Sequence, residues 1–239
     1  MDPPKNKRVK PLPLPKYYKE NEHTFEIGID EAGRGPLFGR VYVAGVVLPK
    51  HMDTTEIRDS KKLTKNKLQT LYTHIRENAV VFHIAFVEAI EIDEINIREA
   101  VLKGMHECAR ECILKLSAAG LPTVDDKETF FLCVDGNDFP PYYHNDAKTC
   151  VSYETFTGGD NRYASMAAAS ILAKVARDDY IRELCLEFPK LSELYGMDKH
   201  MGYGTKQHIE AILQYGITDL HRKTFGTCKG KRICQLDLD

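Results

Sequence analysis

The sequence predicts a mixed α/β fold, in which helices cover a central sheet. Three observations support this prediction. Residues 25–30 alternate apolar and polar side chains, as in a strand with one buried face. Residues 96–116 repeat apolar side chains at helical spacing. Residues 129–135, TFFLCVD, are almost continuously apolar, which is typical of a central strand covered on both faces.

The first half of the chain is predicted to contain three strands and one helix. The first strand, at about 24–31, is followed by the β-branched run 40–48, which we predict to be its hairpin partner. Residues 64–77 have a helical charge pattern and begin with Thr64, a residue type favoured at helix N-termini. Residues 80–87 are the third predicted strand.

The second half alternates helices and strands. The strand at 129–135 follows the helix at 96–116, an order that favours parallel pairing with an earlier strand. Residues 148–156 are predicted to form a fifth, shorter strand, and a helix at about 164–186 follows the turn Gly158-Gly159-Asp160. This helix begins ASMAAASILAKVA, and its small side chains allow it to lie close to the sheet.

Two segments flank the predicted α/β domain, which spans residues 23–187. Residues 1–22 are charged and rich in proline, so we expect a flexible basic tail. Residues 188–239 are expected to form a small helical appendage, in which Thr205 caps the helix KQHIEAILQY and Gly216 ends it.

The composition is that of an ordinary globular protein, because 43% of the 239 residues are hydrophobic and 28% are charged. Apolar runs fall short of the ~20 residues of a membrane helix, and the N-terminus lacks the apolar core of a signal peptide. The seven cysteines form no C-x-x-C pair and indicate a reduced, intracellular protein. We therefore expect a cytoplasmic location, or a nuclear one in a eukaryotic or viral source.

A formal net charge of −2 argues against a protein that coats nucleic acid indiscriminately. Local basic clusters still leave room for a nuclease. They lie at Lys61-Lys62 with Lys65 and Lys67, at His221-Arg222-Lys223, and at Lys229, Lys231 and Arg232. The alternative is that these side chains are ordinary solvated surface.

Acidic residues follow three of the predicted strands, namely Asp30 with Glu31, Asp135, and Asp160. Acids at strand ends converge at one edge of an α/β sheet, where ligands bind. Clustered carboxylates repel one another unless a divalent cation lies among them, and all-oxygen sites suit Mg²⁺ or Mn²⁺. Asp30 and Glu31 can serve one site only if the strand ends or twists at Glu31. The alternative is that each Asp only ends a strand in a turn.

The turn Gly33-Arg34-Gly35 follows the first acids after a single residue, Ala32. Glycines carry no Cβ, so this backbone can approach a ligand closely. The alternative is a plain hairpin turn.

Six motifs carry a resemblance to a known family: GIDEAGRGP, DSKKL, VDGN, GGD, AAASILAKVARD and GYGTKQH. In this order, over about four fifths of the chain, they make the sequence similar to type 2 ribonuclease H, the ribonuclease HII group, in its single-chain bacterial form. The resemblance implies a ribonuclease H-like fold with a five-stranded mixed sheet and a small C-terminal helical appendage.

The resemblance implies a catalytic quartet that also binds the metal: Asp30, Glu31, Asp135 and Asp160. Two Mg²⁺ or Mn²⁺ ions are expected there, and hydrolysis would leave 5′-phosphate and 3′-hydroxyl ends. Asp138 lies three residues after Asp135, and we interpret it as a turn residue.

The implied substrates are RNA/DNA hybrids and DNA duplexes that contain ribonucleotides, cleaved 5′ of the ribonucleotide. The implied roles are ribonucleotide removal and RNA primer removal. The appendage would contribute to substrate binding. The expected substrate-binding residues are Gly33, Arg34, Gly35, Lys61, Lys62, Ser170, Tyr203 and, more weakly, Arg222; Lys174 lies one helical turn from Ser170. Pattern alone assigns no general base among His144, His200 and His221.

Alternatives remain within and outside the family. Type 3 enzymes would have Gly-Lys-Gly in the loop and Glu as the last acid, whereas this chain has Arg34 and Asp160. The catalytic subunit of the three-chain eukaryotic enzyme is another relative, but VDGN and GYGTKQH favour a monomer that acts without partner subunits. The tail KRICQLDLD lacks the paired aromatics of a clamp-binding motif. From other classes, we consider an inactive hybrid-binding module and a metal-dependent phosphatase acting on small molecules.

Overall fold

The computed structural model describes residues 12–19, 24–121, 129–144 and 149–234. The strands are β1 (Phe25–Ala32), β2 (Val41–Val47), β3 (Val81–Val87), β4 (Phe130–Asp135), β5 (Tyr143–His144), β6 (Thr149–Cys150) and β7 (Ser152–Phe156). The α-helices are α1 (Lys65–Asn78), α2 (Ala89–Ala118), α3 (Ala164–Glu187), α4 (Lys190–Glu193), α5 (Met197–His200) and α6 (Lys206–Tyr215). Short 3-10 helices are η1 (Ser60–Lys62), η2 (Gly159–Asn161) and η3 (Gly226–Cys228).

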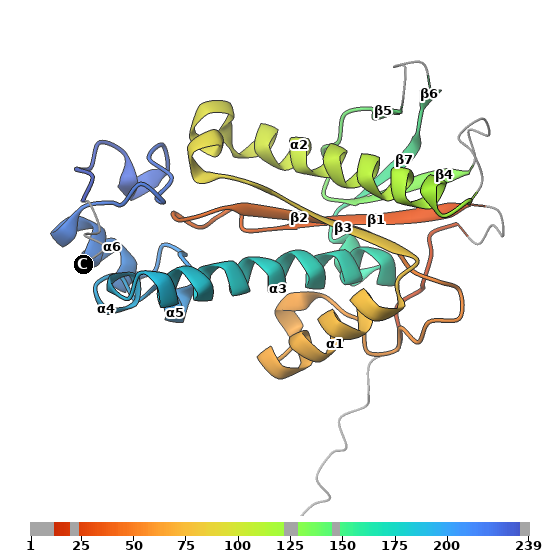
Figure 1. Cartoon of the computed structure of the whole chain (residues 1–239), viewed down its shortest axis with the longest axis horizontal. Helices are drawn as coiled ribbons and strands as arrows, with labels where there is room; N and C mark the ends of the chain where they lie inside the picture. The colour runs from red at the N-terminus through yellow and green to blue at the C-terminus, as the bar shows by residue number, and fades with distance from the viewer. Residues whose placement is uncertain (1–11, 20–23, 122–128, 145–148, 235–239) are drawn as a thin grey trace, which may run out of the picture.

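Five strands form one mixed sheet in the order β3-β2-β1-β4-β7 (Figure 1). The pairs β1–β2 and β2–β3 are antiparallel, whereas β1–β4 and β4–β7 are parallel. The first three strands form a meander, and β4 then pairs with β1 after the crossover through α2. This confirms the predicted five-stranded mixed sheet, including the parallel pairing of the central apolar strand.

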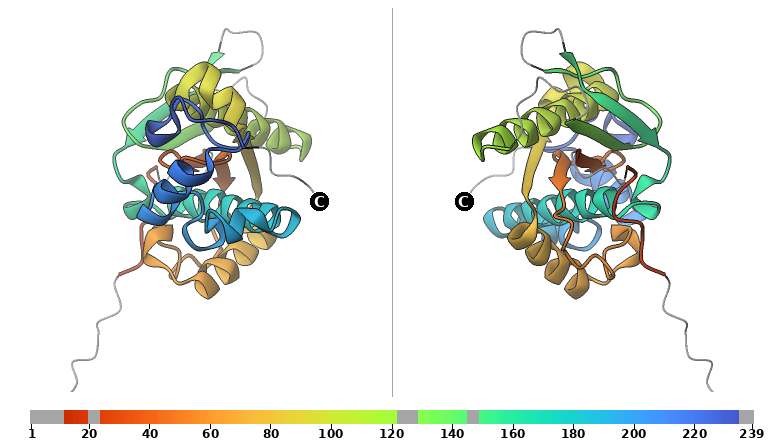
Figure 2. Two further views of the ribbon diagram at one scale, coloured as in Figure 1. Left: turned by 90° about the vertical axis from the view of Figure 1, so that its left-hand side faces the viewer. Right: turned by 90° about the vertical axis from the view of Figure 1, so that its right-hand side faces the viewer.

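Helices cover both faces of the sheet (Figure 2). Helix α2 packs on one face with a core of β-strand and helix side chains, and α3 packs on the other face with α1 outside it. Helix α3 lies very close to β1, because a Cβ added at Gly28 would lie 2.4 Å from the carbonyl carbon of Ser165. The prediction that small side chains let this helix approach the sheet is consistent with that geometry.

Two predicted elements differ from the structure. Helix α2 begins at Ala89, seven residues earlier than the predicted start at 96, and Asn96 interrupts it with a φ of 68°. The Asn96 side chain accepts hydrogen bonds from the amides of Arg98 and Glu99, at 2.9 and 3.2 Å, and so caps the second part of the helix. The predicted strand 148–156 is divided, because β6 pairs with β5 outside the main sheet and only β7 joins β4.

Part of the expected tail contacts the domain. Lys16 Nζ donates to the carbonyls of Lys50 and Met52, both at 2.6 Å, and the Tyr17 hydroxyl donates to the carbonyl of Leu48 at 2.8 Å. Residues 12–19 therefore lie along the sheet end where β1 begins; residues 1–11 and 20–22 of the expected tail lie outside the described residues.

Within the described ranges, no helix combines the length and apolar character that crossing a membrane requires.

Candidate active site

Three acids lie at one edge of the sheet, where β1, β4 and β7 end. Ile29 of β1 pairs with Val134 of β4, so Asp30 and Asp135 occupy the next matched positions on neighbouring parallel strands. Their backbones are therefore about 4.8 Å apart, and their side chains leave the same face of the sheet. Asp160 lies in η2, which follows β7. The ends of these strands therefore place Asp30, Asp135 and Asp160 at one edge of the sheet.

Glu31 is the exception in this geometry. Strand β1 continues through Ala32, so the first of the two expected conditions, a strand that ends at Glu31, is not met; the chain turns at Gly33, whose φ is 99°. Asp30 and Glu31 therefore alternate across the sheet. The Glu31 carboxylate accepts from Arg34 Nη1 at 3.4 Å. Burial raises the pKa of Glu31, and the Arg34 charge opposes this, while the Asp135 charge adds to it. The Glu31 charge thus still acts on the same site.

The acids destabilise one another as anions. Asp30 is only 4% exposed, and burial raises its pKa well above the ordinary value. The charges of Glu31 and Asp135 raise it further. Burial also raises the pKa of Asp160, with Asp59 and Asp135 contributing. A divalent cation at this edge would relieve this repulsion.

Each carboxylate has a local hydrogen-bond donor. Asp30 Oδ1 accepts from the Glu31 amide at 2.6 Å, Asp135 Oδ1 from the Gly159 amide at 2.6 Å, and Asp160 Oδ1 from Asn161 Nδ2 at 2.9 Å. Among the described residues, no three Asp, Glu, His or Cys side chains already form a cluster that could hold one ion. The donor type, the charge and the strand positions fit a divalent ion. These hydrogen bonds use only Oδ1 of each carboxylate, so they do not prevent the other oxygen from binding an ion.

The short helix η1 places a lysine against the acids. Burial lowers the pKa of Lys61, but neighbouring carboxylates, led by Asp160, outweigh this effect and the pKa is raised. Asp59 caps η1 by accepting from the Lys61 amide at 2.9 Å, and it also accepts from Asn161 at 3.3 Å. Lys62 donates to the Asn161 side chain. Asp59 is a fifth acid at this edge of the sheet and was not among the predicted site residues. Its position just before Ser-Lys-Lys is typical of a residue that caps a helix.

Ser170 and Lys174 have partners away from the acids. The hydroxyls of Ser170 and Ser60 are hydrogen-bonded, with 2.8 Å between their oxygens, and Ser170 is buried. Lys174 Nζ donates to Asp178 at 2.6 Å along the same helix. Ser170 therefore joins α3 to η1 next to Lys61. Its side chain is buried there and is not part of an open surface.

Arg222 holds the glycine loop from inside. It is fully buried, and burial lowers its pKa to about 9. Its guanidinium donates to four loop carbonyls, those of Gly33, Arg34, Pro36 and Gly39, at 2.8 to 3.0 Å. This corrects the expectation that Arg222 binds substrate directly, because its guanidinium is enclosed and donates to backbone carbonyls.

Arg177 is a second buried arginine beneath the loop, and the sequence analysis did not single it out. It comes from α3 and donates to the carbonyls of Arg40 and Phe38, both at 3.3 Å, and of Met201 at 2.9 Å. A Cβ added at Gly33 would lie 2.3 Å from Arg177 Nε. Glycine at this position is therefore required both by its positive φ and by the arginine packed against it.

Tyr203 lies beside the loop. The Leu37 amide donates to the carbonyl of Gly202 at 2.9 Å, and a Cβ added at Gly35 would lie 3.9 Å from the Tyr203 ring. Tyr203 is 43% exposed, and Arg34 and Gly35 are also exposed. The segment predicted to form the C-terminal appendage thus places the Tyr203 ring next to the turn Gly33-Arg34-Gly35.

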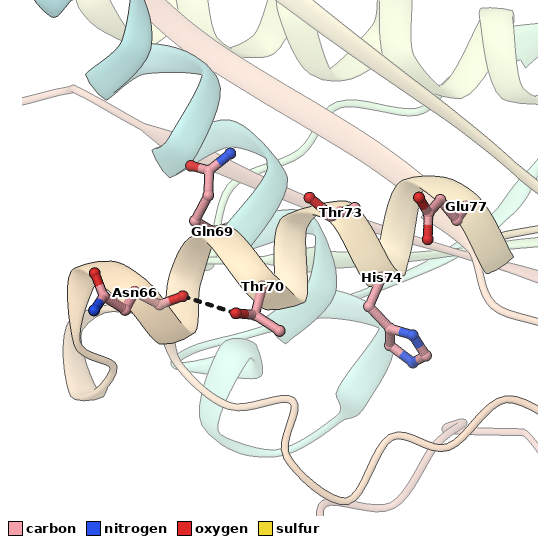
Figure 3. A pocket seen from close by; sticks show the side chains of 6 residues that line it. All are labelled: Asn66, Gln69, Thr70, Thr73, His74 and Glu77. Carbon is pink, nitrogen blue, oxygen red and sulfur yellow. Dashed lines mark hydrogen bonds between the residues drawn. The ribbon is translucent and has the colours of Figure 1, made fainter.

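Other candidates lie elsewhere. Asp138 is exposed and accepts from Arg98 at 2.5 and 2.9 Å, as a surface ion pair. His144 lies in β5 beside the Tyr142 hydroxyl, 3.4 Å away. A shallow depression follows the outer side of α1 (Figure 3). Its lining residues are Asn66, Gln69, Thr70, Thr73, His74 and Glu77, and they include none of the clustered acids.

Comparison with known proteins gives one family. A family model described as Ribonuclease HII matches residues 27–228. The Ribonuclease HII of Francisella tularensis subsp. novicida (strain U112) is 42% identical over 199 residues, which make up 83% of this chain and 95% of that protein.

Solved structures agree in fold. The chain is similar to ribonuclease HII in its complex with PCNA from Archaeoglobus fulgidus, with a TM-score of 0.60 and 25% identity over 84% of this chain and 95% of that one. Bst-RNase HIII in complex with Mn²⁺ has a TM-score of 0.55 and 18% identity, over 87% of this chain and 68% of that one. Because the family model covers most of the chain and the Francisella relative is similar over nearly its whole length, this chain belongs to the ribonuclease HII family and is a ribonuclease H enzyme.

Proposed function

We propose that this protein hydrolyses the RNA strand of RNA/DNA hybrids and nicks DNA duplexes on the 5′ side of embedded ribonucleotides. The observation that carries the proposal is the adjacency of two features. Only Ala32 separates Asp30 and Glu31 from the loop Gly33–Gly35, and that loop lies against Tyr203. The proposed cleavage site thus lies next to the surface that we propose contacts the ribonucleotide sugar.

The ribonuclease H family depends on divalent metal ions. We propose that Asp30, Glu31, Asp135 and Asp160 hold two Mg²⁺ or Mn²⁺ ions. When bound, the ions would lower the pKa of the attacking water and stabilise the leaving 3′-oxygen, so that 5′-phosphate and 3′-hydroxyl ends result. The raised pKa values of Asp30 and Asp160 support this assignment, because burial and repulsion make both carboxylates strained without a cation.

The residues around the acids would bind and orient the nucleic acid. Lys61 carries its charge beside the carboxylates, where a phosphate of the cleaved strand would lie, and Lys62 borders it. The loop backbone at Gly35 can approach a 2′-hydroxyl because no Cβ is present. Tyr203 can pack its ring on the adjoining deoxyribose. Arg222 and Arg177 would act indirectly, by holding the loop.

The biological roles that follow are removal of ribonucleotides from DNA and of RNA primers. We propose that the protein acts as a monomer without partner subunits. Docking on a sliding clamp through the C-terminus is not proposed, although the Archaeoglobus relative was solved with PCNA; residues 235–239 lie outside the described part of the chain.

The test uses three end-labelled duplexes of equal length: one with a single ribonucleotide, one RNA/DNA hybrid and one of DNA only. With Mg²⁺ or Mn²⁺, the first should be nicked 5′ of the ribonucleotide, the second at several positions and the third not at all. Product ends should be ligatable 5′-phosphates and 3′-hydroxyls. Binding without cleavage would indicate an inactive hybrid-binding module, and undiminished cleavage in a chelator would refute the metal assignment.

A further inference from the structure

A chain of histidines lies inside the appendage, directly behind Tyr203. His208 of α6 and His221 are both fully buried, and their Nε2 atoms are 3.1 Å apart. The His200 ring stacks on His208, with 4.9 Å between centroids. The proposed reaction gives no role to any of the three.

The neighbours of the pair determine where its protons lie. The Thr218 amide donates to His221 Nδ1 at 2.9 Å, so that nitrogen carries a lone pair. The proton of a neutral His221 is then on Nε2, from which it donates to His208 Nε2. The proton of a neutral His208 is consequently on Nδ1, which is 2.9 Å from the carbonyl oxygen of Tyr203.

Burial supports this assignment of neutral rings. It lowers the pKa of His208 to about 4 and that of His221 to about 3; the charge of His200 lowers the pKa of His208 further, and the charge of His208 lowers the pKa of His221 further. At neutral pH the direction of donation is therefore fixed from Thr218 through His221 and His208 to Tyr203.

The hydrogen-bonded series from Thr218 through His221 and His208 to Tyr203 forms a relay. Residues next to both of its ends also contact the chain that follows the glycine loop. The amide of Arg222, the residue after His221, donates to the carbonyl of Leu37 at 2.8 Å, and the His221 ring packs edge-on against Phe38, 5.0 Å between centroids. At the other end, Gly202 accepts from the Leu37 amide. The loop is thus held between the segment that carries Tyr203 and the segment that carries Arg222, and the histidine pair joins these segments behind it.

We propose that His208 and His221 are positioning residues that fix Tyr203 relative to the loop Gly33–Gly35, and that selectivity for an embedded ribonucleotide depends on them. This inference rests on the proposed function of that loop and of Tyr203. The histidines touch no substrate and act through the Tyr203 backbone and through the segment that ends in Arg222.

The variants separate this role from a merely structural one. His208→Gln can still meet His221 but offers no donor to the Tyr203 carbonyl. It should reduce kcat/KM on the single-ribonucleotide duplex about tenfold, as expected for one buried hydrogen bond, and on the continuous hybrid less than about threefold. His208→Asn places its amide near the original Nδ1 and should restore most of the selectivity. His144→Gln, at a buried histidine in β5, should leave the ratio unchanged.

A double-mutant cycle gives the decisive comparison. In a Tyr203→Ala background, His208→Gln should have no further effect on the ratio of the two kcat/KM values. Additive losses, or equal losses on both substrates, would overturn the proposal.

The protonation of the two histidines can also be measured without substrate. This measurement tests the relay even if the protein does not cleave the proposed substrates. Nitrogen-15 NMR of the histidine side chains at pH 7 should show a neutral Nδ1–H tautomer for His208 and a neutral Nε2–H tautomer for His221. Charged rings or the opposite tautomers would overturn the relay. Failure of the wild-type protein to nick the single-ribonucleotide duplex would instead overturn the proposed function.

Discussion

Replacing Asp30 should change stability and activity in opposite directions, because its buried charge destabilises the metal-free protein but would bind the metal. It is buried with its charge close to those of Glu31 and Asp135, and its pKa is raised well above the usual value, which is about 3.9. The folded state therefore disfavours the ionised form. This cost is fully present above the raised pKa, and it is lost as the pH falls through that pKa towards the ordinary value. Replacing Asp30 by Asn removes the charge at constant shape.

The expected size of the effect follows from the surroundings of the side chain. Asn keeps an oxygen that can accept from the Glu31 amide, as Asp30 Oδ1 does at 2.6 Å. Removing a buried charge without a compensating cation should then stabilise the metal-free protein by on the order of 1–3 kcal/mol. For a chain of this size, that is a rise in Tm of about 2–12 °C. Activity should fall roughly 10³-fold or more, because the lost carboxylate would hold the metal.

The assay is thermal unfolding in the presence of a chelator, measured at pH 7 and again at pH 5. The stability gain of Asp30→Asn should be smaller at pH 5 than at pH 7, because a carboxyl group with a raised pKa loses more of its charge at the lower pH. Asp138→Asn is the matched control: Asp138 is exposed, and its hydrogen bonds with Arg98 lower its pKa. It should show no gain in stability and keep its activity. A lower Tm for Asp30→Asn than for the wild type would refute the idea of mutual repulsion among the acids.

Three further predictions follow from the same geometry. Since burial raises the pKa values of Asp30, Glu31 and Asp160, protons should compete with Mn²⁺ well above pH 4; calorimetric titration should show affinity falling from pH 8 to pH 5, and a constant affinity would contradict this. Tyr203→Ala should reduce cleavage at a single ribonucleotide about tenfold relative to a hybrid, an effect of ~1.4 kcal/mol, with Mn²⁺ affinity unchanged; equal loss on both substrates would argue against a role in selectivity. Gly33→Ala should destabilise the protein by about 1–3 kcal/mol in denaturant unfolding, because the φ of Gly33 is 99° and the new Cβ would overlap Arg177. Gly120→Ala, with a φ of 72° and no atom within 4 Å of the new Cβ, should show a smaller loss from backbone strain alone.

The fold could be predicted because its signals are local. Period-two alternation, helical spacing and a continuous apolar run depend on which face each residue buries, and the order of elements then restricts the topology. The first part of α2, residues 89–95, was not predicted in this way. The predicted helix begins at Asn96, whose side chain does cap the second part of α2, but the helical turns before this break were missed.

The acids of the site could be located because strand ends in a parallel pair meet in space. Register places Asp30 beside Asp135 without any information on side-chain conformation. The arginines could not be assigned so readily. Arg222 is 183 or more residues from the loop carbonyls it binds, and its burial results from the docking of the appendage on the loop. An exposed lysine or arginine and an enclosed one have the same appearance in the sequence.

The most direct test of the account is the anomalous X-ray scattering of Mn²⁺ in crystals grown with an uncleaved single-ribonucleotide duplex. The account predicts Mn²⁺ peaks about 2.0–2.6 Å from carboxylate oxygens of Asp30 and Asp135. Peaks only at other acids would contradict it.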